Sequence, residues 1–306
     1  PPYQILSGLV GSEMCIRDRY SWRHQFGALA EAGYHAVAPD MRGYGDSDKP
    51  FEIEAYNQVE VIKDIIGLIP ALGYETAVVF GHDWGAPTAW SCALNHPDKV
   101  SAVGALSVPF RPRGDSPPLA ILKAIFKDRF CYQLYFQEPG KAEADLETDI
   151  YKFMRGFLYS ISGDALRNSD IREPFDGHFP AGEALTDQLV SPDELPPWLT
   201  EEDLNFYVEE ITRTGFRGGL NWYRNINRLP AITAPFLGST INQPSFYMGG
   251  STDLIAGNTP DAISSMQQAL GDLRHCEIIE GAGHWLQQEC SSEVSSAMIS
   301  FLEGLD

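Results

Sequence analysis

The chain has 306 residues, of which 43% are hydrophobic and 21% are charged, an ordinary globular composition that excludes wholesale disorder. This length suits one large α/β domain, or a core domain that carries an inserted cap. With 22 Lys and Arg against 42 Asp and Glu, the formal net charge is −20 at pH 7, and such a surface repels polyanions. We therefore expect neither nucleic acid nor an anionic membrane as a partner.

No stretch approaches the ~18 consecutive apolar residues that a membrane helix needs, and the first residues lack the zones of a signal peptide. We therefore expect a cytoplasmic protein. The five cysteines are scattered and show no C-x-x-C spacing, so the sequence predicts neither a disulfide framework nor a metal site.

Residues 1–19 differ from the rest of the chain. The first residue is not Met, and residues 11–19 fit no helix or strand pattern. The string at residues 11–19, GSEMCIRDR, resembles the translation of a sequencing-library adapter. We interpret residues 1–19 as a non-native segment and expect the natural sequence to begin near Tyr20.

From residue 21 onward, helical and strand patterns alternate. Apolar residues at helical spacing predict one helix that starts at residue 21 and ends at Gly33, and another over residues 59–69 that ends near Pro70. A helix of small residues is expected at 85–95. Short apolar runs predict strands at 34–39, 76–80 and 100–108. This alternation is typical of a doubly wound parallel sheet.

Between residues 109 and 235 the alternation stops, and helical stretches interrupted by Pro and Gly appear at 142–161 and 200–227. Thr200 and Asp203 have the spacing of a capping box for the second stretch. The alternation then resumes with a strand at 245–249, a helix at 262–270, a strand at 276–279 and a final helix around residues 294–302.

This order predicts a helical cap inserted between two halves of one sheet. We expect the first part of the core at residues 20–112, the cap at 113–234 and the second part of the core at 235–306. Residues 1–19 are too few to supply two or three further strands at the start of the sheet. We therefore expect the N-terminal strands to be missing.

Residues 81–85, Gly-His-Asp-Trp-Gly, lie between a predicted buried strand and the helix of small residues. This context fits a nucleophile elbow, a sharp turn that exposes its central residue and leaves little room two positions away on either side. The centre is Asp83, and a carboxylate attacks saturated carbon to form an alkyl ester. Epoxides and alkyl halides are then the candidate substrates. The simpler alternative is a turn in which Asp83 only caps the next helix.

An ester on Asp83 needs a general base to activate water, and the base needs a carboxylate that fixes its tautomer. His284 lies in a glycine-rich loop after the strand expected at 276–279, and Asp253 follows the strand at 245–249. Both positions belong to the carboxyl edge of the sheet, in the chain order expected behind Asp83. Taken singly, a loop histidine is usually a surface residue and such an aspartate a turn former.

From about Tyr20 to the C-terminus, the chain resembles a soluble epoxide hydrolase of the α/β-hydrolase superfamily. The resemblance rests on residues 39–45 (PDMRGYG), 81–85 (GHDWG), 132–140 (YQLYFQEPG), 215–225 (GFRGGLNWYRN) and 281–285 (GAGHW). It implies that Asp83 opens an epoxide, and that His284, oriented by Asp253, hydrolyses the resulting ester to a vicinal diol. It implies no cofactor and no metal.

By their positions in the two cap motifs, Tyr132 and Tyr223 are implied to donate hydrogen bonds to the epoxide oxygen. A phenol suits this role because it is a neutral donor at pH 7, although packing alone would make either tyrosine an ordinary core residue. The resemblance also implies Trp84 as an oxyanion-hole residue and Trp222 as a substrate-binding residue. The expected partners are water and a small apolar epoxide, because Phe, Trp and Leu occur throughout the cap. The physiological epoxide, its selectivity and the oligomeric state are left open.

The chain departs from the family in one respect. Family members carry a His-Gly-aromatic-Pro loop before the segment that matches residues 21–25, and one N–H of that loop completes the oxyanion hole; no such loop is present here. We therefore expect impaired folding, impaired ester hydrolysis, or both. Two alternatives stay open: a haloalkane dehalogenase, which would use the same triad and hold a halide with Trp84, and a ligand-binding protein or catalytically impaired chimera on the same fold.

Overall fold

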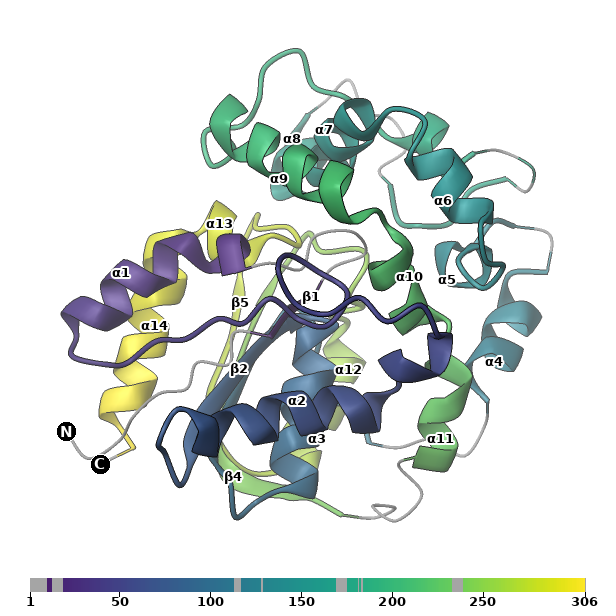
Figure 1. Cartoon of the computed structure of the whole chain (residues 1–306). Coiled ribbons are helices and arrows are strands. Elements are labelled where there is room, and N and C mark those ends of the chain that lie inside the picture. The colour runs from purple at the N-terminus through teal and green to yellow at the C-terminus, as the bar shows by residue number, and fades with distance from the viewer. Residues whose placement is uncertain are drawn as a thin grey trace.

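A computed structural model describes residues 10–12, 19–112, 117–127, 129–168, 175–180, 182, 184–232 and 239–305. A parallel sheet forms its centre, with helices on both faces (Figure 1). The strand order is β1-β2-β3-β4-β5, and every neighbouring pair is parallel. The strands are β1 (Val10–Ser12), β2 (Ala77–Asp83), β3 (Val100–Leu106), β4 (Ile241–Gly250) and β5 (Leu270–Ile279).

Alternate residues of β2 face two different hydrophobic clusters. On one face, Val78 and Phe80 pack with α1 (Arg23–Glu31) and α14 (Ser291–Glu303). On the other face, Val79 belongs to the cluster that includes side chains from the three helices α2 (Gln58–Ala71), α3 (Gly85–Asn95) and α12 (Pro260–Ala269). Burial on both faces explains why residues 77–80 of β2 form a continuous apolar run.

Between β3 and β4 the chain leaves the sheet and forms a layer of helices beyond its carboxyl edge (Figure 1). These helices have an apolar cluster of their own. They are α4 (Pro118–Ile125), α5 (Tyr132–Tyr135), α6 (Lys141–Leu146), α7 (Ile150–Ser160), α8 (Gly163–Arg167), α9 (Glu201–Thr214) and α10 (Arg217–Tyr223), with the 3-10 turns η3 (Leu185–Gln188) and η4 (Ile226–Arg228). The short helix α11 (Leu229–Ile232) follows η4 and returns to the core, where it contacts α2. We refer to the layer from α4 to η4 as the cap. Its expected boundaries at residues 113 and 234 lie outside the described residues and stay predictions.

The remaining short elements are η1 (Arg19–Trp22), η2 (Ile53–Tyr56) and α13 (Leu286–Glu289). The capping box expected at the start of α9 is present: Thr200 Oγ1 accepts from Asp203 N at 3.1 Å, and Asp203 Oδ2 accepts from Thr200 N at 2.9 Å. The helical stretch expected at 142–161 is two helices, α6 and α7. In the part of the chain that the structure describes, no helix has the length and apolar character needed to cross a bilayer.

Two expectations near the N-terminus are wrong. Residues 34–39 form no strand, although alternate side chains face opposite clusters as they would in one. Residues 10–12 form β1, with Val10 opposite Gly81 and Ser12 opposite Asp83, although residues 11–19 were expected to form no strand. A strand is defined by backbone hydrogen bonds, and the edge of β2 offers N–H and C=O groups to any backbone that lies beside it. The rest of the adapter-like segment, residues 1–9 and 13–18, lies outside the described residues.

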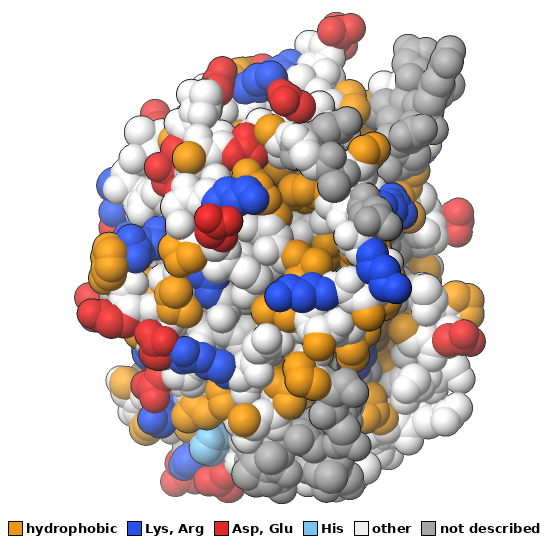
Figure 2. Space-filling model, turned by 90° about the vertical axis from the view of Figure 1, so that its right-hand side faces the viewer, with side chains coloured by type: hydrophobic (Ala, Val, Ile, Leu, Met, Phe, Trp, Pro, Cys, Tyr) orange, Lys and Arg blue, Asp and Glu red, His pale blue; other side chains and the backbone are white. Residues whose placement is uncertain are grey.

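The face that carries α4 and α11, at the right of Figure 1, is turned toward the viewer in Figure 2. Apolar side chains with a few Lys and Arg among them gather near its centre, and Asp and Glu lie mainly toward its edges (Figure 2). Ile121 and Ile125 of α4 are among the exposed apolar residues. This face is therefore less acidic than the net charge of −20 alone indicates.

Candidate active site

The turn from β2 to α3 places Asp83 at the carboxyl edge of the sheet. Asp83 has a φ of 48°, in the left-handed region that residues other than glycine seldom adopt. The turn is also crowded, because a Cβ on Gly81 would clash with the carbonyl oxygen of Gly85. The two glycines thus let strand and helix approach closely enough to hold Asp83 in this conformation.

His284 and Asp253 lie beside Asp83, on the loops that follow β5 and β4. His284 Nε2 is 3.4 Å from Asp83 Oδ1, and His284 Nδ1 is 2.9 Å from Asp253 Oδ2. The second oxygen of Asp253 accepts from the backbone N–H groups of Ile255 and Ala256, at 3.1 and 3.0 Å. Asp253 is therefore held in place, its Oδ2 accepts from Nδ1–H, and Nε2 faces the elbow.

The interactions among these residues raise the pKa of His284 and lower the pKa of Asp253. Burial alone would lower the pKa of His284, but the charges and hydrogen bonds of Asp253 and Asp83 raise it well above its ordinary value. Burial opposes the ionisation of Asp253, but His284 and the N–H of Ala256 hold the pKa of Asp253 below its ordinary value. The carboxylates of Asp83 and Asp253 therefore stabilise the protonated form of His284.

His82, next to Asp83 in β2, supports His284 from the opposite side of the strand. His82 Nε2 is 2.8 Å from the carbonyl oxygen of His284, and Ser107 Oγ donates to the same oxygen at 3.0 Å. The side-chain nitrogen Nε2 of Gln287 is 3.1 Å from His82 Nδ1. Because that amide nitrogen can only donate, His82 Nδ1 accepts and Nε2–H donates to His284. The sequence predicts no role for His82, although its place beside Asp83 puts it on the opposite face of the strand.

A cavity of ≈ 280 Å³ lies over Asp83. Asp83, Tyr132 and Tyr223 supply polar groups to its wall, and apolar residues such as Trp84, Val108 and Ile226 supply most of the rest. Pro118 of α4 and Leu229 of α11 also line it, so the cavity lies behind the face shown in Figure 2.

Another cavity, of ≈ 300 Å³, lies beside Asp40, Arg42 and Asp64. None of the three residues around the elbow lines it. Of these two cavities, only the one over Asp83 is lined by candidate reacting groups. We therefore assign the candidate site to that cavity. In the described ranges, no cluster of three or more His, Cys, Asp or Glu side chains is arranged to hold a metal ion.

Tyr132 and Tyr223 come from different cap helices, α5 and α10, and meet at the cavity. Their ring centroids are 5.9 Å apart in an edge-to-face arrangement. Gln133 Nε2 donates to the hydroxyl oxygen of Tyr132 at 3.1 Å, so the phenolic proton of Tyr132 is left for an acceptor. Burial, and then the charge of Asp83, raise the pKa of Tyr132, so this residue is a neutral donor over the ordinary pH range.

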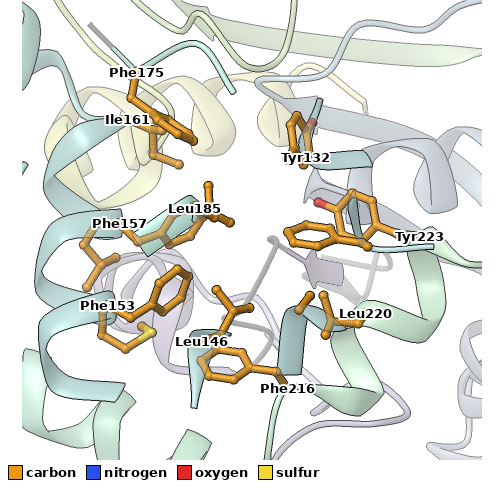
Figure 3. Close-up of a cluster of buried hydrophobic side chains, with 14 of the residues drawn as sticks. Tyr132, Leu146, Phe153, Phe157, Ile161, Phe175, Leu185, Phe216, Leu220 and Tyr223 are labelled. Carbon is orange, nitrogen blue, oxygen red and sulfur yellow. The ribbon is translucent and has the colours of Figure 1, made fainter. Parts of the chain in front are cut away.

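Figure 3 shows the two tyrosines next to each other on one side of the apolar cluster of the cap, across from Phe157 and Ile161. The indole of Trp84 meets the ring of Tyr223 edge to face, with centroids 5.0 Å apart. The elbow and the cap are therefore in direct contact at the cavity.

The backbone of Trp84 lies at the N-cap of α3, so its N–H is among the groups that a helix leaves unpaired at its start. Asp83 Oδ2 is buried and accepts no hydrogen bond from the described residues. The positive end of the α3 dipole lies at this point as well. These features favour the oxyanion role expected of Trp84. The family's second donor would precede residues 21–25, and residues 13–18 are not described.

The structure does not bring Trp222 into the cavity, which corrects the substrate-binding role expected for it. Its indole is buried in the cluster between the sheet and α2, and Nε1 donates to the carbonyl oxygen of Arg42 at 3.3 Å. Successive helical residues point about 100° apart, so a helix that aims Tyr223 at the cavity turns Trp222 toward the core. Trp222 thus anchors α10 to the body of the protein.

Comparisons with known proteins identify the family of the chain. A family model of the α/β-hydrolase fold matches residues 5–289. The chain is similar to epoxide hydrolase A of Mycobacterium tuberculosis, with 44% identity over 287 residues, which are 94% of this chain and 87% of that protein.

Two solved structures are also similar. One is an epoxide hydrolase from an endophytic Streptomyces, with a TM-score of 0.92 and 40% identity over 99% of this chain and 90% of that one. The other is epoxide hydrolase A from Mycobacterium thermoresistibile, with a TM-score of 0.89 and 41% identity over 99% of this chain and 92% of that one.

The close approach at the elbow predicts opposite effects for two glycine substitutions. Gly81→Ala places a Cβ against the backbone of Gly85 and should lower the free energy of unfolding by about 1–3 kcal/mol or more. Gly67→Ala, inside α2 with no neighbouring atom within 4 Å, should raise it by about 0.5–1 kcal/mol. Urea unfolding curves measure both. A Gly81→Ala variant as stable as the wild type would contradict the crowded turn.

The charge arrangement predicts a shift in the titration of His284. Asp83→Asn removes one of the two carboxylates that raise the pKa of His284, so that pKa should fall. NMR titration of the histidine ring protons measures this shift. Asp98→Asn, remote from the site, serves as the control. An unchanged pKa of His284 in Asp83→Asn would show that the two residues are not coupled.

Proposed function

The chain belongs to the α/β-hydrolase fold family and is an epoxide hydrolase, and on that premise we propose that Asp83 is its nucleophile and His284 its general base. One observation carries the proposal: His284 Nε2 lies 3.4 Å from Asp83 Oδ1, beneath a cavity that two tyrosines also line. The helix-capping alternative for Asp83 gains no support, because α3 shows no side-chain cap hydrogen bond.

In the first half-reaction, an oxygen of Asp83 attacks an epoxide carbon, and the bond between that carbon and the epoxide oxygen breaks. The product is an ester of Asp83 with an alkoxide on the neighbouring carbon. An alkoxide is a poor leaving group unless a donor supplies a proton or a hydrogen bond, and Tyr132 and Tyr223 line the cavity as such donors. Gln133 already occupies an acceptor position of Tyr132, which directs the phenolic proton elsewhere.

The ester then changes the basicity of His284. An esterified Asp83 carries no charge, so one of the two carboxylates that raise the pKa of His284 is lost. The pKa of His284 falls, and neutral imidazole becomes available as a base. A tyrosine transfers a proton to the alkoxide, and the proton that His284 releases restores the phenol.

In the second half-reaction, His284 Nε2 takes a proton from water, which attacks the ester carbonyl of Asp83. Asp253 holds the imidazole in the tautomer that this step requires. The oxyanion forms next to the start of α3, where the N–H of Trp84 can donate to it. Collapse of this intermediate breaks the bond between the acyl carbon and the alkyl oxygen, and that oxygen takes the proton of the new hydroxyl group. The carboxylate of Asp83 is restored and a vicinal diol is released.

The cavity supports a small, mainly apolar epoxide as substrate, because its volume is ≈ 280 Å³ and most of its wall is apolar. The steps above use protein side chains and water alone. A halide leaving group would need no proton, so the placement of Tyr132 and Tyr223 supports epoxide opening over dehalogenation.

The covalent ester can be trapped. His284→Gln removes the base but leaves the nucleophile, so incubation with styrene oxide should give an adduct on the protein whose added mass equals that of the whole epoxide. Asp83→Ala should give none. Intact-protein mass spectrometry measures both. An adduct in Asp83→Ala, or its absence from a folded His284→Gln variant, would refute the assignment.

The two tyrosines should act on ester formation and not on ester hydrolysis. Tyr132→Phe and Tyr223→Phe each remove one donor to the developing alkoxide, so each should slow ester formation by on the order of 10²-fold. Tyr159→Phe, a buried cap tyrosine away from the cavity lining, should leave it unchanged. Rapid-quench mass spectrometry gives the rate of ester formation. Equal effects in all three variants would point to packing alone.

A further inference from the structure

Glu289, the last residue of α13, joins the histidine loop to the cap through a single carboxylate. Its Oε2 accepts from the backbone N–H groups of Gly163 and Gly283, at 2.9 and 3.0 Å, and its Oε1 accepts from that of Trp285 at 3.0 Å. Gly283 and Trp285 are the neighbours of His284 in the chain, and Gly163 is the first residue of α8 in the cap. The carboxylate therefore holds both sides of His284 and one point of the cap.

Other contacts fix the same place, which we call the cap–histidine contact: residues 158–163 against residues 281–289. The backbone N–H of His284 donates to the carbonyl oxygen of Ile161 at 3.0 Å. The indole N–H of Trp285 donates to the carbonyl oxygen of Leu158 at 2.6 Å. A Cβ on Gly283 would overlap the backbone of the cap at Gly163. The two segments are so close that the loop cannot shift without losing these bonds.

From this geometry we propose that Glu289 is a positioning residue for His284, one that aims Nε2 at the ester on Asp83 by fixing the loop backbone on both sides of the histidine. The inference rests on the proposed roles of Asp83 and His284. Glu289 is absent from the cavity lining, so we place its effect on the reaction in the position of His284.

The chemistry of the three donors explains why a carboxylate is needed. Three N–H groups converge on two oxygens, and an ionised carboxylate accepts at both. An amide at position 289 has one oxygen, and its NH₂ group would face an N–H donor. One end of the contact would then be lost, and the loop that carries His284 would gain freedom. Hydrogen bonds to a charged group are worth more than neutral ones, so the loss is substantial.

The ionisation of Glu289 sets the conditions for a test. Burial raises the pKa of Glu289 to about 7, while the three N–H donors act in the opposite direction. The charge of Asp164 on α8 adds to the rise, and Arg167 on the same helix pairs with Asp164 at 2.8 Å. Cys290 is the next residue in the chain, and burial and then the charge of Glu289 raise the pKa of its thiol. Measurements at about pH 8.5 therefore compare variants with an ionised wild-type Glu289.

The decisive experiment separates the two half-reactions. In a single turnover with styrene oxide, rapid-quench mass spectrometry follows the formation and decay of the ester on Asp83. In Glu289→Gln, formation should stay within about twofold of the wild type, because the elbow and the tyrosines do not contact Glu289. Decay should be about 10- to 100-fold slower, so the ester accumulates. Glu293→Gln, an exposed neighbour on α14, should behave as the wild type.

Other outcomes of this experiment would contradict the positioning role of Glu289. Wild-type decay in Glu289→Gln would overturn the proposal, and so would equal slowing of both steps, which indicates general damage to the fold. If Glu289→Gln does not fold, Glu289→Asp keeps the charge but is one methylene shorter, and the same selective slowing of decay is required of it. If His284→Gln itself gives no ester, the proposed function has failed, and the role of Glu289 fails with it.

Discussion

The left-handed backbone of Asp83 is the constraint on which the rest of the site depends. It exists because β2 and α3 meet with no side chain between Gly81 and Gly85. Once Asp83 is held at the carboxyl edge of the sheet, the loops after β4 and β5 must reach across the end of β3 to meet it. Ser107, directly after β3, also has a positive φ, of 65°, and contacts the carbonyl oxygen of His284 there. The backbone is thus strained at the ends of β2 and β3, where the loops after β4 and β5 meet the elbow.

The charges of the site alternate in sign, and this order explains how one histidine serves both stages of the reaction. Burying charges is costly unless they are paired and hydrogen bonded. Here each carboxylate has His284 as a partner, and Asp253 has two backbone donors as well. Covalent attachment of the substrate removes the charge of Asp83 and leaves His284 with a single partner. The substrate itself therefore releases the base, at the moment when the base is needed.

The sequence predicted what depends on local pattern and chain order. The helix expected at residues 85–95 is α3, because its small residues and the glycines of the elbow carry a strong local signal. Asp253 and His284 could be placed at the same edge as Asp83, because parallel strands end on the same side of a sheet. The positions of these three residues in the structure agree with that placement, while their catalytic roles stay proposals.

What the sequence could not predict depends on contacts without a local signal. Strand β1 forms through backbone pairing at an edge, where side-chain pattern matters little. Trp222 was expected at the substrate because it lies in the same motif as Tyr223, but neighbours on a helix point in different directions. The roles of His82 and Glu289 depend on partners far away in the chain, such as Gly163, which is 126 residues from Glu289.

The cap–histidine contact has a consequence for how the protein reaches its working state. The core elements that hold Asp83 and Asp253 could assemble while the cap is still unfolded, but the backbone bonds of His284 to Ile161 and of Glu289 to Gly163 cannot form until the cap has docked. A half-folded chain would then hold a nucleophile without an aligned base. Such a chain would also lack the donors Tyr132 and Tyr223, which the cap supplies to the cavity, so complete maturation of the fold is a condition of both half-reactions.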